Sequence, residues 1–452
     1  MISLAPKRIV LTTYGSLGDL HPYLALAIGL RDRGHLPVIA THGAYGDKIL
    51  AEGVGFAPVA PDLTELGDPR EFARRAFATQ GGEGYLLKHA ILAPRHRSYA
   101  DQMAAVGDNT DLIINHPLTY TMRLVAEKKN VPWISVALAP AAFMSAYEPF
   151  VFPQAPWVSR LQPLLGVERY RKLQQLIKDV TYSWTAPIHA LRAEVGLPPI
   201  KENLIFEGAW SRLGTIALFP PALGEPQPDW HPNTVQTGFC VYDKAEAGVG
   251  MPPEITAFLA SGDAPIVFTL GSAAVMDAGT FYTVSAAAAA KLGKRAILLT
   301  GKDPANVPAN LPAGILAAPY APYSELFPHC AAVVHQGGVG TTGQAMRAGR
   351  PQIVLPHGFD QYDNAERMAK RGIGRVVTKF GYTTANVARE LSTLLGDPAY
   401  ADRAANVAEQ IRGVNGIQAA CDVVETVIRH GCTLPASNAA RAESAPRPVL
   451  ST

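Results

Sequence analysis

Short apolar runs alternate with longer amphipathic segments through the first part of the chain. Arg8–Tyr14 and Leu36–Thr41 are apolar runs of strand length, and a helix is predicted between them, with Pro22 early in it and Gly34 at its end. Thr110–His116 predicts a further strand, again followed by a helix and a strand. Strand–helix–strand repeats of this length are typical of a parallel, doubly wound α/β sheet.

A second alternation of the same kind begins at Ala264–Ala274 and continues through further apolar runs to His335 and beyond. It predicts a second parallel sheet of similar size, although the two halves share no fixed-period repeat. Two such domains facing one another would hold a ligand at the carboxyl ends of their strands. Architecture alone does not name the chemistry of that ligand.

The pattern changes at several points, and these changes predict the domain boundaries. Residues 1–220 are expected to form the first domain and residues 251–415 the second, with the proline-rich residues 221–250 as the passage between them. Residues 416–432 have a helical pattern. Residues 433–452 are small, polar and proline-bearing, and are predicted to be disordered.

Composition excludes several classes of protein. The chain of 452 residues is 48% hydrophobic and 17% charged, which is typical of a soluble globular protein of two or three domains. Its net charge of +2 gives no reason to expect nucleic acid as a partner. Neither a transmembrane run nor a signal-peptide core is apparent, so a cytoplasmic enzyme is expected. The cysteines lack metal-type spacing and are predicted to be reduced, mostly buried thiols: Cys240, Cys330, Cys421 and Cys432.

A glycine-rich segment begins at His335, with four glycines in nine residues, where a predicted strand meets a predicted helix. Glycines let the backbone approach an anion, and the helix N-terminus stabilises negative charge, so a diphosphate is the natural occupant. His335 could donate to a phosphate oxygen. The alternative is a tight turn without a ligand. The residues expected to contact the diphosphate are His335, Gly337, Gly338, Gly340, Thr341 and Thr342.

Asp360 and Gln361 follow the next predicted strand, which returns them to the same edge of the sheet. A carboxylate beside an amide offers several acceptors and donors for the neighbouring hydroxyl groups of a sugar. Together with the diphosphate loop, the pair predicts a nucleotide-sugar site. Alternatively, the pair caps the helix that follows it.

The order of these motifs resembles the donor signature of the family 1 glycosyltransferases, which have the GT-B fold of two facing Rossmann-like domains. The resemblance covers nearly the whole chain and is strongest to the bacterial branch that includes sterol, antibiotic-aglycone and rhamnolipid-type rhamnosyl transferases. It implies that residues 416–432 pack back on the first domain. The matching residues are Tyr320, Ala321, Pro322, His335, Gly337, Gly338, Gly340, Thr341, Thr342, Gly349, Pro351, Pro356, Asp360, Gln361, Asn364 and Ala365.

The resemblance implies roles for the donor half of the cleft. Tyr320 occupies the position where many members stack a tryptophan on the pyrimidine, and Ala321 would bind the base edge through its backbone. Gly271 and Ser272 match the small turn beside the phosphates. Gly343 stands where many relatives have a glutamate that binds the ribose, which favours a dTDP-sugar slightly over a UDP-sugar. No metal is required, because no DxD-type carboxylate pair is found.

An acceptor hydroxyl needs a base within hydrogen-bond reach. The resemblance places Asp19 at the position of the base, and His116, at a strand end, would be its partner or contact the acceptor. A single displacement with one base inverts the anomeric centre. Asp19 could instead cap the helix ahead of Pro22, and His116 could be purely structural. His21 would point elsewhere on the first turn of that helix, towards the acceptor side.

The aromatic-rich stretch Phe143–Trp184 is expected to line an apolar acceptor pocket, with ordinary core packing as the alternative. The acceptor would be a phenol or flavonoid, a polyketide or a lipid, and the sugar glucose or rhamnose, on a monomer or weak dimer. A GT-B nucleotide-sugar epimerase and a non-catalytic transferase-like partner protein are the other interpretations. The residues expected to bind the acceptor are His21, Phe143, Met144, Tyr147 and Phe150.

Overall fold

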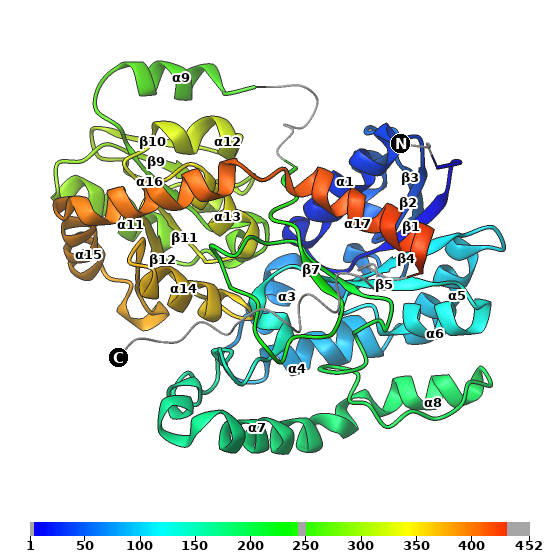
Figure 1. The fold of residues 1–452 in the computed structure, drawn as a ribbon. Helices are drawn as coiled ribbons and strands as arrows, with labels where there is room; N and C mark the ends of the chain where they lie inside the picture. Colours follow the sequence, from blue (N-terminus) through cyan, green and yellow to red (C-terminus); the bar gives the residue numbers. More distant parts are fainter. Residues whose placement is uncertain (1–3, 243–249, 432–452) are drawn as a thin grey trace.

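The computed structural model describes residues 4–242 and 250–431. Cys432, the predicted tail and residues 243–249 of the predicted linker lie outside these ranges. The described chain forms two parallel sheets with helices on their faces, one in each half of the molecule (Figure 1). This confirms the predicted fold class. No helix in the described ranges is both long and apolar enough to cross a membrane.

The first sheet has seven parallel strands in the order β3-β2-β1-β4-β5-β6-β7. Its strands are β1 (Arg8–Thr12), β2 (Leu36–Thr41), β3 (Gly55–Pro58), β4 (Leu112–Asn115), β5 (Trp133–Ala137), β6 (Thr215–Ala217) and β7 (Thr234–Gln236). The helices of this half are α1 (Leu17–Asp32), α2 (Gly46–Leu50), α3 (Pro69–Ala76), α4 (Gly82–Leu86), α5 (Arg95–Val106), α6 (Tyr120–Lys129), α7 (Gln162–Thr181) and α8 (Ala186–Glu194).

The second sheet has six parallel strands in the order β10-β9-β8-β11-β12-β13. Its strands are β8 (Ile266–Thr269), β9 (Ala296–Leu299), β10 (Ile315–Ala318), β11 (Ala332–His335), β12 (Gln352–Val354) and β13 (Gly374–Val376). Its helices are α9 (Pro253–Ala260), α10 (Gly271–Ala274), α11 (Phe281–Lys291), α12 (Tyr323–Leu326), α13 (Val339–Arg347), α14 (Gln361–Lys370), α15 (Thr384–Gly396) and α16 (Pro398–Arg412), and α17 (Gly416–His430) follows.

Each sheet has one point where the direction of strand addition reverses, between β1 and β4 in the first and between β8 and β11 in the second. Ligands of open parallel sheets bind outside the carboxyl ends of the strands at such points. Asp19 and His116 follow β1 and β4, while Gly271 and the glycine-rich loop follow β8 and β11. The topology therefore places both groups of predicted site residues at the two switch points.

The two halves are in direct apolar contact. Phe77, at the end of α3, packs with the core of the second domain, and its ring centre lies 5.3 Å from that of Phe359. Phe219 and Leu223 of the first half pack with Met368 of α14. Side chains from both domains therefore share two apolar clusters.

The last helix returns to the first domain and lies along α1 (Figure 1). A Cβ at Gly29 would lie 2.6 Å from a methyl carbon of Ile417 and 2.9 Å from the sulfur of Cys421, so glycine allows α17 to approach closely. Arg33 of α1 forms an ion pair with Asp422 at 2.6 Å. Helix α17 (Gly416–His430) therefore packs against α1 of the N-terminal half.

One segment differs from the sequence prediction. Residues 234–236, which were placed in the passage between domains, form β7 and pair with β6 at the edge of the first sheet. The strand is only three residues long and closely follows Pro232. A run this short carries no periodic signal, so the proline-rich composition dominated the prediction.

Candidate functional site

The turn between β1 and α1 presents Asp19 at the first switch point. Ser16 is the N-cap of α1, and the Oδ2 atom of Asp19 accepts a hydrogen bond from the Ser16 backbone N–H at 2.8 Å, which completes a capping box. A Cβ at Gly15, whose φ is 130°, would lie 2.3 Å from that oxygen. Ser16 is therefore the N-cap itself, and Asp19 completes the cap through Oδ2. The Oδ1 atom of Asp19 remains for chemistry.

His116 lies opposite this second oxygen of Asp19. The distance from His116 Nε2 to Asp19 Oδ1 is 3.7 Å, slightly beyond a hydrogen bond. The backbone N–H of Leu118 donates to Nδ1 of the imidazole at 3.2 Å, which assigns the proton to Nε2, facing Asp19. Burial lowers the pKa of His116 to about 3, so the ring is neutral. The structure thus places the two predicted side chains next to each other, and their pairing in catalysis stays a prediction.

Burial also alters the acidity of the carboxyl group. It raises the pKa of Asp19 to about 6, against the smaller opposing effect of the hydrogen bonds from Ser16. A carboxylate with such a pKa is a stronger base than an exposed one and is still mostly ionised at neutral pH. The first switch point therefore holds a group suited to accepting a proton.

Two residues that the sequence analysis missed hold the Asp19 turn in place. His42, just after β2, accepts a hydrogen bond from the Gly15 N–H at Nε2 (3.4 Å), and its Nδ1 lies 2.5 Å from the carbonyl oxygen of Pro61. The Tyr45 hydroxyl donates to the carbonyl oxygen of Gly15 at 3.0 Å. His42 has the same sequence signal as His116, a polar side chain directly after a strand, and could have been found by that rule.

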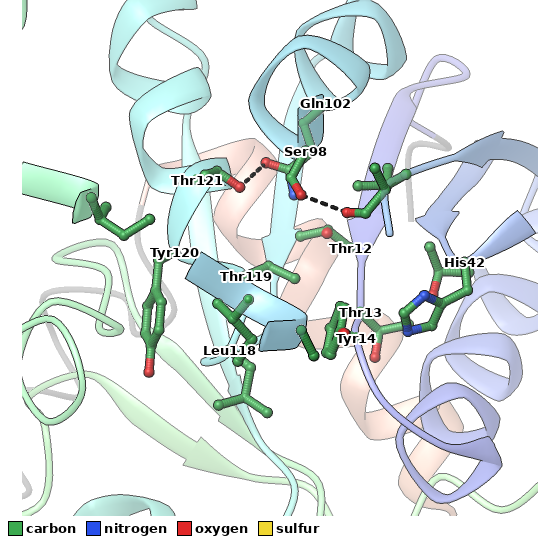
Figure 2. Close-up of a pocket in the computed structure, with 16 residues that line it drawn as sticks. Thr12, Thr13, Tyr14, His42, Ser98, Gln102, Leu118, Thr119, Tyr120 and Thr121 are labelled. Atoms are coloured by element: carbon green, nitrogen blue, oxygen red, sulfur yellow. Dashed lines mark hydrogen bonds between the residues drawn. The ribbon is translucent and has the colours of Figure 1, made fainter. Parts of the chain in front are cut away.

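Behind this turn lies a small polar cavity of ≈ 20 Å³ at the ends of β1, β2 and β4 (Figure 2). Tyr14 and His42 line it, with their ring centres 4.4 Å apart. A polar cavity of this size holds about one water molecule. The hydroxyl oxygens that line it without a partner among the described residues belong to Thr12, Tyr14 and Thr41.

His21 points away from the Asp19 and His116 pair. Its ring centre lies 5.1 Å from that of Tyr242, and the Nζ atom of Lys48 lies 5.0 Å from the centre of the same tyrosine ring. Burial lowers the pKa of His21 to about 3. The ring therefore packs beside the chain that leaves the first domain, apart from the group where an acceptor hydroxyl would react.

Gln336 joins two loops at the second switch point, and the sequence analysis missed it. A Cβ at Gly271, whose φ is 63°, would lie 2.3 Å from the Gln336 Nε2 atom, and a Cβ at Gly338 would lie 2.9 Å from it. The side chain therefore fills the space between the loop after β8 and the loop after β11. Its Oε1 atom is buried without a partner among the described residues. The glycines at 271 and 338 are required by this contact.

His335 is fully buried, and both of its ring nitrogens are engaged inside the protein. Nε2 bonds with the Gln352 Oε1 atom at 2.8 Å, and Nδ1 accepts from the backbone N–H of Gly337 at 3.0 Å. The ring thus shapes the turn, and it does not present the N–H that was predicted to contact a phosphate. Burial of the ring lowers the pKa of His335 to about 4.

The anion site suggested by the glycine-rich loop is the first turn of α13, which has Gly338 as its N-cap. The backbone N–H groups of a first helical turn have no partner within the helix. A Cβ at Gly340 would meet no atom within 4 Å, so open space lies beside this turn. The buried hydroxyl of Thr342 has no partner among the described residues. These groups could hold the oxygens of a diphosphate.

Asp360 stands at the N-cap position of α14, but its side chain makes no capping bond. Its Oδ2 atom accepts from the Asn364 Nδ2 atom at 2.9 Å, and the same nitrogen donates to the carbonyl oxygen of Gly337, also at 2.9 Å. The Oε1 atom of Gln361 accepts from the backbone N–H of His357 at 2.8 Å. Asn364 therefore ties the predicted sugar-binding pair to the anion loop.

Asp360 also faces the catalytic candidate of the other domain. The pKa of Asp360 is raised to about 7, mainly by burial and to a smaller extent by the nearby charge of Asp19, against the lowering effect of the hydrogen bond from Asn364. Two carboxyl groups interact in this way only at short range. The carboxyl group of Asp19, after β1, is therefore near that of Asp360, after β12 in the other domain.

The residues predicted to bind the nucleotide base, Tyr320, which is 46% exposed, and the buried Ala321, lie in the loop after β10. Packing explains why residue 343 is a glycine. A Cβ there would lie 3.0–3.1 Å from three ring carbons of Phe239, which fills the space that a longer side chain would need. The ring of Phe239, from the chain between the domains, thus occupies the space where a glutamate side chain at position 343 would begin.

The predicted acceptor aromatics divide into two groups. Phe143 is stacked between Trp230 and Trp210, with ring centres 4.3 Å and 5.2 Å away, so both its faces are covered and it serves as core. Tyr147 is 41% exposed. Phe150 packs edge-on against Phe152 at 4.8 Å. The segment after Phe143, including Met144, therefore supplies the side chains that remain available to an acceptor.

Within residues 4–242 and 250–431, no group of three or more histidine, cysteine, aspartate or glutamate side chains is arranged to hold a metal ion. The three cysteines in these ranges, Cys240, Cys330 and Cys421, are buried free thiols.

Comparisons with known proteins agree with this architecture. Residues 9–147 match the family model described as glycosyltransferase family 28 N-terminal domain, and residues 285–415 match the one described as erythromycin biosynthesis protein CIII-like, C-terminal domain. O-mycaminosyltylonolide 6-deoxyallosyltransferase of Streptomyces fradiae is 31% identical over 426 residues, which cover 92% of this chain and 97% of that protein.

Two further similarities come from a longer protein and from a solved structure. Sterol 3-beta-glucosyltransferase of Candida albicans is 28% identical over 443 residues, which cover 94% of this chain but 28% of that protein. The crystal structure of the glycotransferase of kitacinnamycin superposes with a TM-score of 0.71 at 20% identity, covering 96% of this chain and all of that one (100%). The last similarity concerns the fold alone.

Proposed function

Because the chain belongs to the family 1 glycosyltransferases of the GT-B fold, we propose that it transfers a hexosyl or deoxyhexosyl group from a UDP- or dTDP-sugar to a hydroxyl of an apolar small molecule. One observation supports the proposal most directly: Asn364 bonds both to the Asp360 carboxylate and to the carbonyl oxygen of Gly337 ahead of α13, and Asp360 is near enough to Asp19 of the other domain for the two charges to interact. A base, a group for sugar hydroxyls and an anion site are the parts that such a transfer needs.

The donor would bind mainly to the second domain. Its diphosphate would accept hydrogen bonds from the first-turn N–H groups of α13 and from the unpartnered Thr342 hydroxyl. Asp360 would accept from sugar hydroxyls through Oδ1, since Oδ2 is bonded to Asn364. Tyr320 would stack on the base, with Gly271 and Ser272 beside the phosphates.

The reaction would be a single displacement. Asp19 takes the proton of the acceptor hydroxyl, the hydroxyl oxygen bonds to the anomeric carbon, and the bond from that carbon to the diphosphate oxygen breaks. The nucleoside diphosphate leaves with its charge stabilised by the helix N-terminus. Attack from the side opposite the leaving group inverts the anomeric centre. His116, with its Nε2–H directed at Asp19, would orient the carboxylate.

The acceptor would be an apolar ring system, such as a polyketide, a lipid or a flavonoid. The names of the relatives refer to a tylonolide and to sterols, which support this class. Met144, Tyr147 and Phe150 would contact the acceptor, because they follow Phe143 on the same segment and their rings or chains are not enclosed. A transferase is favoured over an epimerase because the relatives are transferases.

Nucleotide binding tests the donor half of this proposal. Addition of dTDP or UDP at a hundredfold excess over Kd is expected to raise the Tm by roughly 3–8 °C, because a ligand that binds only the folded state stabilises it. At equal concentrations of the two nucleotides, the shift with dTDP should be the larger, since Phe239 at Gly343 leaves no carboxylate for the ribose. Differential scanning fluorimetry measures both shifts.

Gly340→Asp provides the control for that measurement. The new carboxylate has room, and a negative charge suits a first helical turn, so the fold should persist while the diphosphate is repelled. Gly396→Asp, at an exposed helical glycine of α15 that is also surrounded by open space, should bind nucleotide normally. Equal shifts in both variants would place the nucleotide elsewhere.

A further inference from the structure

The segment 144–151, which carries the exposed acceptor aromatics, is fixed at its beginning within the first domain. Asp229 accepts from the Ser145 hydroxyl at 2.6 Å and from the Ala146 N–H at 2.7 Å. The side-chain amide of Gln174 on α7 donates to the carbonyl oxygen of Met144 at 2.7 Å. We call residues 144–151 the acceptor segment.

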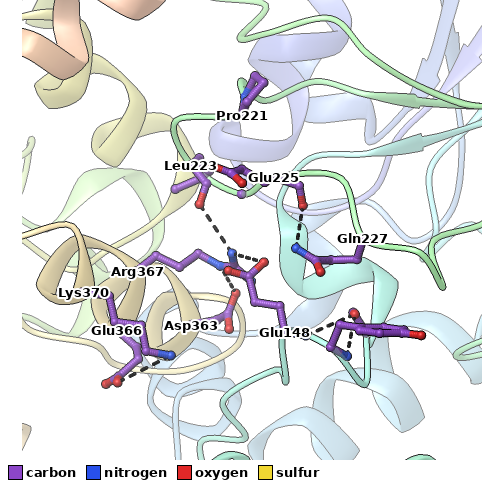
Figure 3. Close-up of polar contacts among 12 residues, drawn as sticks. Glu148, Pro221, Leu223, Glu225, Gln227, Asp363, Glu366, Arg367 and Lys370 are labelled. Carbon is purple, nitrogen blue, oxygen red and sulfur yellow. Dashed lines mark hydrogen bonds and ion pairs between the residues drawn. The ribbon is translucent and has the colours of Figure 1, made fainter. Parts of the chain in front are cut away.

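The end of the acceptor segment is bound to the second domain by a cluster of charges (Figure 3). Arg367 of α14 contacts the Glu148 carboxylate at 2.7 Å and, through Nε, the Asp363 carboxylate at 2.7 Å. The other oxygen of Asp363 accepts from the Val151 N–H at 3.3 Å. The segment is therefore joined to α14 by two separate bonds, one through a side chain and one through the backbone.

This cluster is shielded from water. The side chain of Arg367 is 7% exposed, that of Asp363 is 3% exposed and that of Glu148 is 35% exposed. Arg367 also donates to the carbonyl oxygen of Leu223 at 3.4 Å, which is possible because a Cβ at Gly224 would lie 2.9 Å from the guanidinium. One guanidinium thus serves two carboxylates and a carbonyl, and buried charges in this arrangement are costly to separate.

The helix that carries the cluster also carries the proposed sugar-binding group. Asp360 precedes the first turn of α14, Asp363 lies in that turn, and Arg367 lies one turn further along. Asn364, on the same turn as Asp363, fixes both Asp360 and the anion loop. A displacement of α14 relative to the acceptor segment would therefore move the sugar relative to the acceptor.

We propose that Glu148, Asp363 and Arg367 form an interdomain cluster that aligns the acceptor segment with the sugar-bearing helix during transfer. The proposal rests on the proposed function. Arg367 is in this sense a positioning residue, since it acts through the segment and the helix and does not touch the substrate. Its expected effect is on the alignment of two bound substrates, with little effect on donor binding alone.

Weakening the cluster should change the fate of the donor as well as the rate. When the acceptor hydroxyl is misaligned, water can replace it: its oxygen bonds to the anomeric carbon, its proton goes to Asp19, and free sugar and nucleoside diphosphate are released. The ratio of donor hydrolysis to glycoside formation therefore reports alignment. A residue that only stabilised the fold would lower both rates in proportion to the folded fraction.

Glu148→Gln is the variant of choice, because it keeps the shape of a partly exposed side chain and leaves the pair of Arg367 with Asp363 intact. Its kcat for transfer is expected to fall about 10-fold and its acceptor KM to rise, with the hydrolysis-to-transfer ratio rising about 10-fold and the donor Kd unchanged. Glu366→Gln is the matched control, since the side chain of Glu366 on the same helix is 39% exposed and pairs with Lys370 at 3.9 Å near solvent (Figure 3). It should behave as wild type.

Identical kinetics and product ratios in E148Q and E366Q would overturn the proposal. Should E148Q fail to fold, Arg367→Lys, which keeps the charge but loses the two-sided geometry, must show the raised hydrolysis ratio, and a normal ratio there would equally overturn it. The proposed function fails separately: in that case wild type itself forms no glycoside. Thermal unfolding of each variant confirms that folded protein is compared.

Discussion

Replacing Asp19 with asparagine is expected to lower kcat for glycosyl transfer by about 10²–10⁴-fold, the range that a general base contributes. The amide cannot accept the proton of the acceptor hydroxyl. Its oxygen can still accept from the Ser16 N–H, the bond that Oδ2 now makes at 2.8 Å, so the start of α1 should be preserved. Steady-state kinetics with a saturating donor measures the loss, and an unchanged nucleotide Kd shows that the cleft is intact.

The pH dependence of the same reaction checks the assignment independently. The pKa of Asp19 is raised by burial to about 6, so the proton-accepting carboxylate predominates above that pH and is lost below it. The wild-type kcat/KM should therefore fall about tenfold per pH unit on the acid side. The Asp360 carboxylate, whose pKa burial raises to about 7, also loses its charge in acid. The D19N variant should therefore lose only the step near pH 6, while D360N should keep that step. Near-normal turnover by D19N would show that another group is the base.

The second large effect is expected at Asp360. Asp360→Asn should lower kcat/KM for the sugar donor by about 10²–10³-fold, since one or two charge-assisted hydrogen bonds to sugar hydroxyls are each worth about 1.5–3 kcal/mol. The asparagine amide would also oppose the Asn364 Nδ2 atom that now donates to the carboxylate at 2.9 Å. Initial rates at several donor concentrations measure the loss.

Binding of the free nucleotide separates this effect from damage to the whole donor site. The D360N variant should bind dTDP or UDP as wild type does, because the proposed diphosphate site is at the first turn of α13 and the proposed site for the nucleotide base is at Tyr320. Gly340→Asp, by contrast, should lose both nucleotide binding and transfer. If D360N bound the nucleotide weakly but used the sugar normally, the carboxylate would have no role in sugar recognition.

Much of the fold was predictable because parallel strands leave a strong signal. Their apolar runs are buried on both faces, so Ile9, Val10 and Leu11 all have no exposed surface, and each run is followed by a helix of regular period. The switch points follow from strand order, which the sequence does not give, yet polar residues directly after strands pointed to them. β7 was missed because three residues carry no period.

The candidate site was predictable for residues that are marked by their location shortly after a strand. Asp19, His116 and Asp360 each follow a strand; His116 lies beside Asp19, and Asp19 is near enough to Asp360 for their charges to interact. Contacts between distant segments left no such signal. Phe239 fills the space beside Gly343, and Arg367 reaches Glu148 across the domain boundary.

Side-chain chemistry alone also failed to separate core from site. His335 has the residue type of a phosphate donor, but its two nitrogens are bonded to Gln352 and to the backbone of Gly337. Phe143 has the residue type of an acceptor contact, but Trp210 and Trp230 cover its faces. Which partner a buried group selects depends on packing between elements, and this is fixed only in three dimensions.

The most direct test is the product of the wild-type protein. It should be incubated with UDP- and dTDP-glucose and -rhamnose and a panel of polyketide aglycones, sterols and phenols, followed by mass spectrometry and by NMR of any glucoside. A glycoside formed together with one equivalent of nucleoside diphosphate, with a β-linkage from an α-linked glucose donor, is the expected result. Folded protein that releases no nucleoside diphosphate and forms no glycoside with any pair would contradict the proposed transfer.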